Sequence, residues 1–150
     1  MSFFIKKLNK SEVQLAKQFI HQWFEDDEPS SSFLPSNNYI KTNLAKDDSH
    51  VYVAIENGKV VGGLTAYEIP MFYREEAEMF LYEIGVDKDH RRKGIARSLI
   101  EALKKTCILK GIKEIFVGTS MENHAARRLY ESTGGNVEVS PWYNYNLNLK

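Results

Sequence analysis

A short basic loop between a predicted strand and a predicted helix constrains the fold of this chain more than any other feature. Residues 79–86 are mostly apolar and predict a β-strand, and residues 95–110 carry apolar side chains at helical spacing. Between them, residues 90–94 read His-Arg-Arg-Lys-Gly. A strand, a glycine-containing turn and a helix N-terminus place unpaired N–H groups and the positive end of the helix dipole at one point. The sequence therefore predicts an anion site here, of the kind that holds a pyrophosphate.

The side chains of this loop suit a phosphate ligand. Gly94 and Ala96 are small, so a phosphate group can approach the backbone closely. Basic side chains flank that glycine and supply charge opposite to the ligand's: Arg91, Arg92, Lys93 and Arg97. The glycine pattern is neither that of a P-loop nor that of a dinucleotide-binding turn. A solvated basic turn without a ligand is the alternative interpretation of the loop taken alone.

Length, charge and cysteine content narrow the class of protein. A chain of 150 residues suits one domain, residues 1–150, with its own core. The formal net charge of zero disfavours a nucleic-acid partner, and no segment approaches the ~20 apolar residues of a membrane span. One cysteine excludes an internal disulfide and fits a reducing compartment, and the N-terminal segment lacks the pattern of a secretory signal. We expect a cytoplasmic protein with neither a nucleic-acid nor a membrane partner.

The rest of the chain predicts further strands and helices. Asn57-Gly58 between two β-rich runs predicts a type I′ hairpin, and Ser11 with Gln14 predicts a capping box at the first helix. The predicted strands span residues 3–8, 51–55, 60–69, 79–86 and 112–118. The predicted helices span residues 11–23, 37–45, 95–110 and 123–132.

The end of the chain predicts two more strands. Residues 137–139 and 142–149 are rich in β-branched and aromatic side chains and turn at Pro141. The whole pattern predicts one α+β domain, with a central mixed, mostly antiparallel sheet of about seven strands flanked by about four helices. A homodimer contact through this strand pair would use its aromatic side chains: Trp142, Tyr143 and Tyr145.

Two motifs resemble those of the GNAT family of N-acetyltransferases. Arg91-x-x-Gly94-x-Ala96 resembles the family signature Gln/Arg-x-x-Gly-x-Gly/Ala, and residues 123–134 resemble its Asn-x-x-Ala-x-x-x-Tyr-x-x-x-Gly helix. The order of the predicted elements also resembles the GNAT fold. The resemblance implies that acetyl-CoA is the cosubstrate, with its pyrophosphate at the basic loop. The residues that it implies for acetyl-CoA binding are Ile84, Gly85, Val86, Arg91, Arg92, Lys93, Gly94, Ile95, Ala96, Arg97, Asn123 and Tyr130.

A closer resemblance is to one branch of that family. Residues 63–72, 78–82 and 90–96 resemble the type I aminoglycoside 3-N-acetyltransferases, the gentamicin-modifying branch. Two positions depart from the branch. Glu83 stands where an aspartate is usual, which keeps the carboxylate, and Gly135 stands where an aromatic residue is usual.

Two residues are candidates for proton transfer. Glu83 lies on the strand that carries the acetyl group in the family, where a carboxylate can deprotonate an ammonium substrate. Strand alternation places Glu83 and Gly85 on one face, and Ile84 and Val86 on the other. Tyr130 resembles the family tyrosine that protonates the coenzyme A thiolate. The alternatives are a structural carboxylate paired with Arg or Lys for Glu83, and a half-buried core residue for Tyr130.

Other polar residues have simpler interpretations beside the functional ones. An acidic run would attract a polycationic substrate, and ordinary solvated surface is the alternative for it: Glu25, Asp26, Asp27 and Glu28. Asn123 is also placed to act only as a helix N-cap. Cys107 falls on the apolar face of its helix and is expected in the core. The histidines lack metal-ligand spacing, so no metal is predicted.

These observations predict an acetyl-CoA-dependent N-acetyltransferase that acts on a primary amine of a small cationic substrate, with an aminoglycoside as a candidate. Two alternatives remain open at this point. One is a catalytically silent acyl-CoA-binding sensor on the same fold, which would need only the loop. The other is a protein or peptide N-acetyltransferase.

Overall fold

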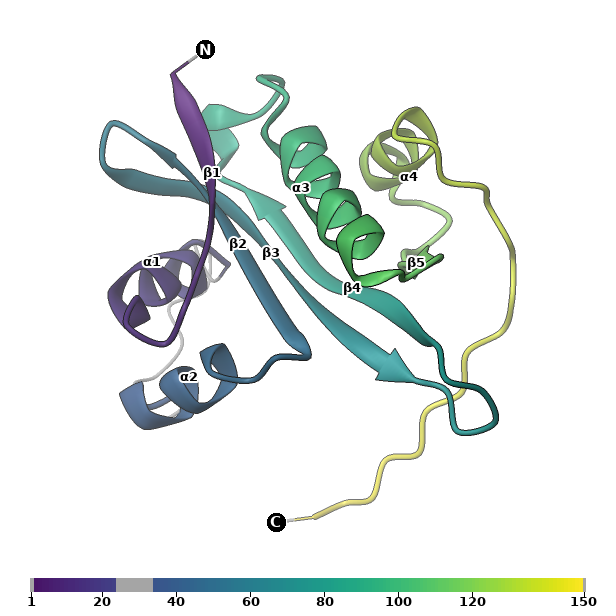
Figure 1. Ribbon diagram of the computed structural model, residues 1–150. Helices are drawn as coiled ribbons and strands as arrows, with labels where there is room; N and C mark the ends of the chain where they lie inside the picture. The colour runs from purple at the N-terminus through teal and green to yellow at the C-terminus, as the bar shows by residue number, and fades with distance from the viewer. Residues whose placement is uncertain (1, 24–33, 150) are drawn as a thin grey trace.

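One five-stranded sheet forms the centre of the protein. The computed structural model describes residues 2–23 and 34–149 (Figure 1). β1 to β4 pair antiparallel, and β5 pairs parallel to β4. In spatial order the strands are β1 (Phe3–Lys7), β2 (Ser49–Glu56), β3 (Lys59–Pro70), β4 (Ala77–Val86) and β5 (Ile115–Phe116). The α+β class and the mixed, mostly antiparallel sheet are confirmed.

Helices cover both faces of this sheet. α1 and α2 lie on one face, and α3 and α4 lie on the other (Figure 1). The helices are α1 (Val13–Trp23), α2 (Asn37–Leu44), α3 (Ile95–Lys110) and α4 (His124–Ser132), and a 3₁₀ turn (Lys88–His90) precedes α3. All four predicted helices are therefore present. In the described part of the chain, no helix is long and apolar enough to cross a membrane.

Each face of the sheet has its own core cluster. On the α3 side, Leu99 and Leu103 pack against Leu64 of β3 and Met79 of β4, and all four side chains are fully buried. Cys107 joins this cluster, as the sequence predicts, and burial raises the pKa of its thiol. On the other side, the buried cluster joins α1 and α2 to β2 and β3 through Phe19, Ile40, Val53 and Val60.

The first helix begins two residues later than the sequence predicts, at Val13 rather than Ser11. The turn before it has reciprocal contacts of its own: the Asn9 N–H donates to Glu12 Oε1 at 2.9 Å, and the Ser11 N–H donates to Asn9 Oδ1 at 2.9 Å. Asn9 and Glu12 have the same three-residue spacing as Ser11 and Gln14. The turn that they close includes Ser11, so α1 starts after it. The Asn57-Gly58 hairpin is confirmed, with both residues at positive φ (51° and 75°).

The predicted number of strands is also wrong. The sequence predicts about seven strands, but the described residues form five. Residues 112–118 contribute only the two-residue β5, and residues 135–149 follow the outside of the molecule without strand structure (Figure 1). A strand needs a neighbouring edge for its N–H and C=O groups, and β5 offers a very short one. Trp142, Tyr143 and Tyr145 are exposed, and the homodimer contact through them stays a prediction.

The close approach of α1 to the sheet depends on Gly63. A Cβ atom at this position would lie 2.9 Å from Phe19 Cδ1 and 2.9 Å from the Tyr52 carbonyl oxygen. Because real Cβ atoms essentially never come so near, an added methyl group would push the helix away from β3 or distort the β2–β3 ladder.

We therefore expect Gly63→Ala to lower the free energy of unfolding by about 1–3 kcal/mol, the usual cost of overpacking. Urea unfolding measures this as a lower midpoint with an unchanged slope. Gly118→Ala is the matched control, because nothing lies within 4 Å of a Cβ there. That variant should stay within about 0.5 kcal/mol of wild type. Equal midpoints for the two variants would contradict this account of α1 packing.

Candidate active site

The site is built where β4 and β5 separate. β4 pairs with β3 along most of its length, but it pairs with β5 only through Met79 and Phe80. Within the described residues, the half of β4 from 81 to 86 therefore has an edge with no strand beside it. An open strand edge presents N–H and C=O groups that can pair with an extended ligand, such as the amide-containing arm of an acyl carrier molecule.

A β-bulge in β4 determines which way the side chains of this open half point. Thr65 pairs with Glu83 and Ala66 pairs with Leu81, so Tyr82 is left without a partner on β3. The extra residue shifts the alternation by one position, which is a common device beside active sites. Met79 and Leu81 before the bulge and Ile84 and Val86 after it all pack on the α3 side.

Glu83 points to the opposite face, where α1 and α2 lie. Thr65 Oγ1 donates a hydrogen bond to Glu83 Oε2 at 2.6 Å, and the two residues are direct cross-strand partners. Among the described residues, no Lys or Arg forms an ion pair with Glu83. The alternative role of Glu83, a structural carboxylate paired with Arg or Lys, is therefore not found in that part of the chain. One carboxylate oxygen is thus oriented by a hydroxyl, and the group is partly accessible for a further polar contact.

Tyr130 lies on the other side of the sheet. Its ring is partly buried against the core cluster of the α3 side, and burial raises the pKa of its hydroxyl. The group is therefore protonated across the neutral range and can donate a proton. Glu83 and Tyr130 thus lie on opposite faces of the sheet, a proton acceptor on one face and a proton donor on the other.

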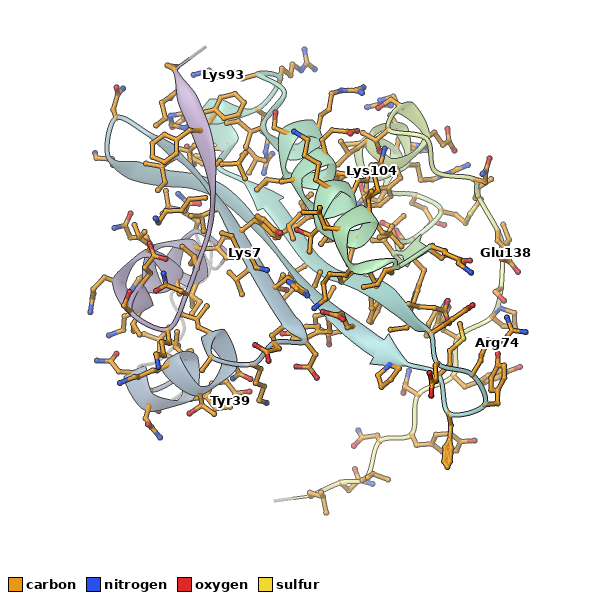
Figure 2. All side chains as sticks on the ribbon, viewed as in Figure 1. Lys7, Tyr39, Arg74, Lys93, Lys104 and Glu138 are labelled. Carbon is orange, nitrogen blue, oxygen red and sulfur yellow. The ribbon has the colours of Figure 1, made fainter. Side chains whose placement is uncertain are left out.

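Contacts at both ends of α4 position Tyr130. Asn123 is the N-cap, and its Oδ1 accepts the Ala126 N–H at 3.1 Å. At the other end, Arg97 of α3 donates to the Ser132 hydroxyl at 3.0 Å, and Lys104 Nζ donates to the Thr133 carbonyl oxygen. Lys104, labelled in Figure 2, lies on the side of α3 that faces α4. Arg97, expected from sequence to face a phosphate, thus has its guanidinium on α4 instead.

The backbone of the basic loop has the shape of an anion site. Gly94 is the N-cap of α3 with φ 82°, and Arg92 also has a left-handed φ of 64°. Left-handed residues this close together make the concave turns in which several N–H groups point at one anion. A Cβ atom at Gly94 would meet nothing within 4 Å, and the first turn of α3 has no acidic residue. This helix start therefore has room for a phosphate and no acidic side chain in its first turn to repel one.

An ionic cluster holds the base of this loop. His90 Nδ1 lies 2.5 Å from Asp87 Oδ2, and His90 Nε2 lies 3.0 Å from Glu56 Oε2. Lys93 Nζ is 3.7 Å from the same Glu56 oxygen, and the Ser2 hydroxyl also donates to Glu56. Sequence analysis missed Glu56, because its nearness to the loop depends on the pairing of β2 with β3 and of β3 with β4. Arg91 Nε donates to the Val86 carbonyl oxygen at 3.3 Å, which fixes the loop to the end of β4.

A cavity of about 290 Å³ opens where β4 leaves β5. The residues that line it are Phe80, Leu81, Tyr82, Gly118, Thr119 and Trp142. Trp142 was expected in a strand pair, and its place in this wall was not foreseen. A larger cavity of about 620 Å³ lies around the β3–β4 turn and the far end of α3, remote from the loop and from Glu83.

Two further predictions concern metals and the acidic run. In the ranges that the structure describes, no three His, Cys, Asp or Glu side chains gather as metal ligands would. The absence of a metal stays a prediction. Glu25, Asp26, Asp27 and Glu28 lie outside the described residues.

Comparison with known proteins identifies the family. Residues 17–134 match the family described as "Acetyltransferase (GNAT) family". The chain belongs to this family. The family predicted from the loop and the α4 motif is therefore confirmed.

Named relatives come from several organisms. N-acetyltransferase family 8 member 3 of Mus musculus is 26% identical over 110 residues, which is 73% of this chain and 49% of the relative. The ribosomal protein bS18-alanine N-acetyltransferase of Escherichia coli is 35% identical over 81 residues, which is 54% of this chain and 51% of the relative. The chain spans about half the length of these curated relatives.

Solved structures match over the whole chain. The aminoglycoside acetyltransferase HMB0005 from an uncultured soil metagenomic sample has a TM-score of 0.87 and 34% identity, with 100% of both chains covered. The aminoglycoside acetyltransferase meta-AAC0020, also from such a sample and crystallised with sisomicin, has a TM-score of 0.89 and 27% identity. The match covers 99% of this chain and 97% of that one.

Proposed function

We propose that this acetyltransferase moves the acetyl group of acetyl-CoA to a primary amine of a small cationic substrate, and that aminoglycosides are such substrates. The observation that carries the proposal is the position of Glu83. Its carboxylate lies on the open half of β4, without a cationic partner among the described residues, and on the face opposite Tyr130. The full-length match to aminoglycoside acetyltransferases supports the substrate class. The type I 3-N branch is the finer proposal.

Different residues of the chain bind different parts of acetyl-CoA. The N–H groups at Gly94, Ile95 and Ala96 bind the pyrophosphate, and basic side chains of the loop add charge: Arg91, Arg92 and Lys93. The backbone of residues 84–86 pairs with the pantetheine arm, and Gly85 leaves room for it. Asn123, at the start of α4, completes the contacts that we propose with the cosubstrate.

Glu83 and Tyr130 carry out the proton transfers. Glu83 accepts a proton from the substrate ammonium, directly or through water, so that the neutral amine can attack the thioester carbon. A backbone N–H of the open β4 edge stabilises the developing oxyanion. As the C–S bond breaks, Tyr130 donates its proton to the departing sulfur; burial raises the pKa of this hydroxyl, so the proton is present at neutral pH. Bound acetyl-CoA supplies the thioester.

The acidic run supports a cationic acceptor. Four carboxylates in succession, residues 25–28, would attract a polycation at long range. A peptide N-terminus is the second candidate acceptor, because the bS18-alanine N-acetyltransferase is 35% identical over 81 residues. Coenzyme A release with sisomicin, spermidine and an alanine-initiated peptide as separate acceptors tests the assignment. Release with the peptide alone would overturn it, and release with none would leave the acyl-CoA sensor.

Gly94→Val should abolish acetyl-CoA binding, because the added side chain would occupy the approach of the pyrophosphate. Thermal-shift titration measures this as loss of the stabilisation that the ligand gives by mass action. Gly111→Val is the matched control: Gly111 caps the other end of α3, with a similar φ of 72° and the same open surroundings. Both variants should lose similar stability without ligand. A retained acetyl-CoA shift in Gly94→Val would refute the pyrophosphate assignment.

Tyr130→Phe should lower kcat by about 10²–10⁴-fold, the usual contribution of a general acid, and leave the acetyl-CoA thermal shift unchanged. The ring and its packing remain, so the fold should not change. Wild-type turnover across the pH range would return Tyr130 to its alternative role as a core residue.

Glu83→Gln should reduce kcat/KM most at low pH, where most of the substrate amine is protonated and a base matters most. Steady-state rates from about pH 6 to about pH 9, a range in which most enzymes stay folded, measure the effect. Glu78→Gln, the same change on the same strand away from the open half, is the control. A loss that is equal at every pH would assign Glu83 a positioning role.

A further inference from the structure

Aromatic side chains form a continuous row beside Glu83. Phe116 of β5 stacks on Phe80 of β4, with ring centroids 4.6 Å apart and an angle of 13°. Phe80 meets Tyr82 edge to face at 5.4 Å and 83°, and Tyr82 meets Tyr67 of β3 edge to face at 5.9 Å and 75°. The row thus crosses three strands and ends at Tyr67, which lies two residues from the Thr65 that holds Glu83.

The last ring of the row is electrostatically coupled to Glu83. The Thr65 hydroxyl, which donates to Glu83, lies near both the carboxylate and the Tyr67 phenol. Burial and then the negative charge of Glu83 raise the pKa of Tyr67, and Tyr39 of α2 and Tyr82 act in the same direction. The phenol is therefore uncharged at neutral pH. Tyr67 of β3 therefore has the carboxylate of Glu83, Tyr82 of β4 and Tyr39 of α2 in its surroundings.

These tyrosines are more exposed than core packing explains. Tyr39, Tyr67 and Tyr82 are 64%, 38% and 61% exposed, whereas Tyr52 in the core is 5% exposed. The face of an aromatic ring is electronegative and attracts a cation within about 6 Å of the centroid. The rings of Tyr67 and Tyr82 stand almost perpendicular and form the two walls of a corner, which we call the tyrosine corner. The carboxylate of Glu83 lies beside it. The complementary ligand group is an organic cation.

We propose that Tyr67 and Tyr82, together with Tyr39, bind a second, non-reacting ammonium group of the acceptor while Glu83 faces the reacting amine. This inference rests on the proposed function for the role of Glu83. It predicts that the acceptor carries two or more cationic centres, and that a monoamine of the same length is a poorer substrate. Thr65 acts as a positioning residue, because its hydrogen bond orients the carboxylate beside the Tyr67 ring.

A binding measurement tests the subsite without any turnover. Choline and 3,3-dimethylbutan-1-ol have nearly the same shape and differ in charge. Titration followed by the NMR signals of the tyrosine rings should show saturable binding of choline and much weaker binding of the neutral alcohol. Equal binding of both compounds would identify an apolar pocket and overturn the proposal, and so would the absence of choline binding.

Variants of Tyr67 separate the ring face from the hydroxyl. Tyr67→Phe keeps the face and should keep choline affinity, whereas Tyr67→Leu removes the face and should weaken choline binding by about 2- to 30-fold. Tyr82→Leu should have an effect of the same kind, and it provides a second variant should Tyr67→Leu fold poorly. Tyr143→Leu, at an 83% exposed tyrosine of the C-terminal segment, is the matched control. Equal choline affinity in both corner variants and in the control would overturn the subsite.

Turnover separates this inference from the proposed function. Tyr67→Leu should raise KM for 1,4-diaminobutane with little change in kcat, and should leave KM for butylamine unchanged. An equal rise for both amines would contradict a second-cation subsite. If choline binds as described but neither amine nor an aminoglycoside is acetylated, the subsite stands and the proposed function fails.

Discussion

The pairing of β4 with β5 through only two residues is the contact on which the rest of the site depends. Were β5 to continue alongside β4, every N–H and C=O group of that edge would be used within the sheet. Because the strands part after Phe80, the edge stays open, a cavity forms in the gap, and α4 packs on the α3 side of the sheet with Tyr130 against the core there. The loop that follows β4 then turns directly into the N-terminus of α3 at Gly94.

Local sequence predicts the parts of this arrangement that local chemistry decides. The hairpin at Asn57-Gly58 needs two left-handed residues, and the start and end of α3 need glycines with positive φ. The apolar spacing of α3 and α4 needs only the helical period. Because these features are local, the loop and the burial of Cys107 could be predicted before the chain was folded.

The rest of the site depends on pairing between segments that are distant in the sequence, and local sequence does not determine that pairing. The bulge at Tyr82 is a property of the register between β3 and β4, and a regular alternation fits the sequence of β4 equally well. The Glu56–His90 contact joins residues that only the folded sheet brings together, and Arg97 turns to α4 for a partner that lies 35 residues away. The last fifteen residues have strand-like alternation, but β5 is too short to pair with them.

The bulge also fixes the register of β4. Side chains after it point the opposite way from those that an unbroken strand of the same length would give, so one residue decides whether Glu83 faces α2 or the buried core. If Tyr82 took a partner on β3, regular alternation would turn Glu83 to the side of Met79 and Leu81, and an acid would enter the apolar interior at a prohibitive cost of desolvation. Burial of a charge therefore disfavours the regular pairing of β3 with β4, and the irregular strand is the more stable arrangement of this sequence.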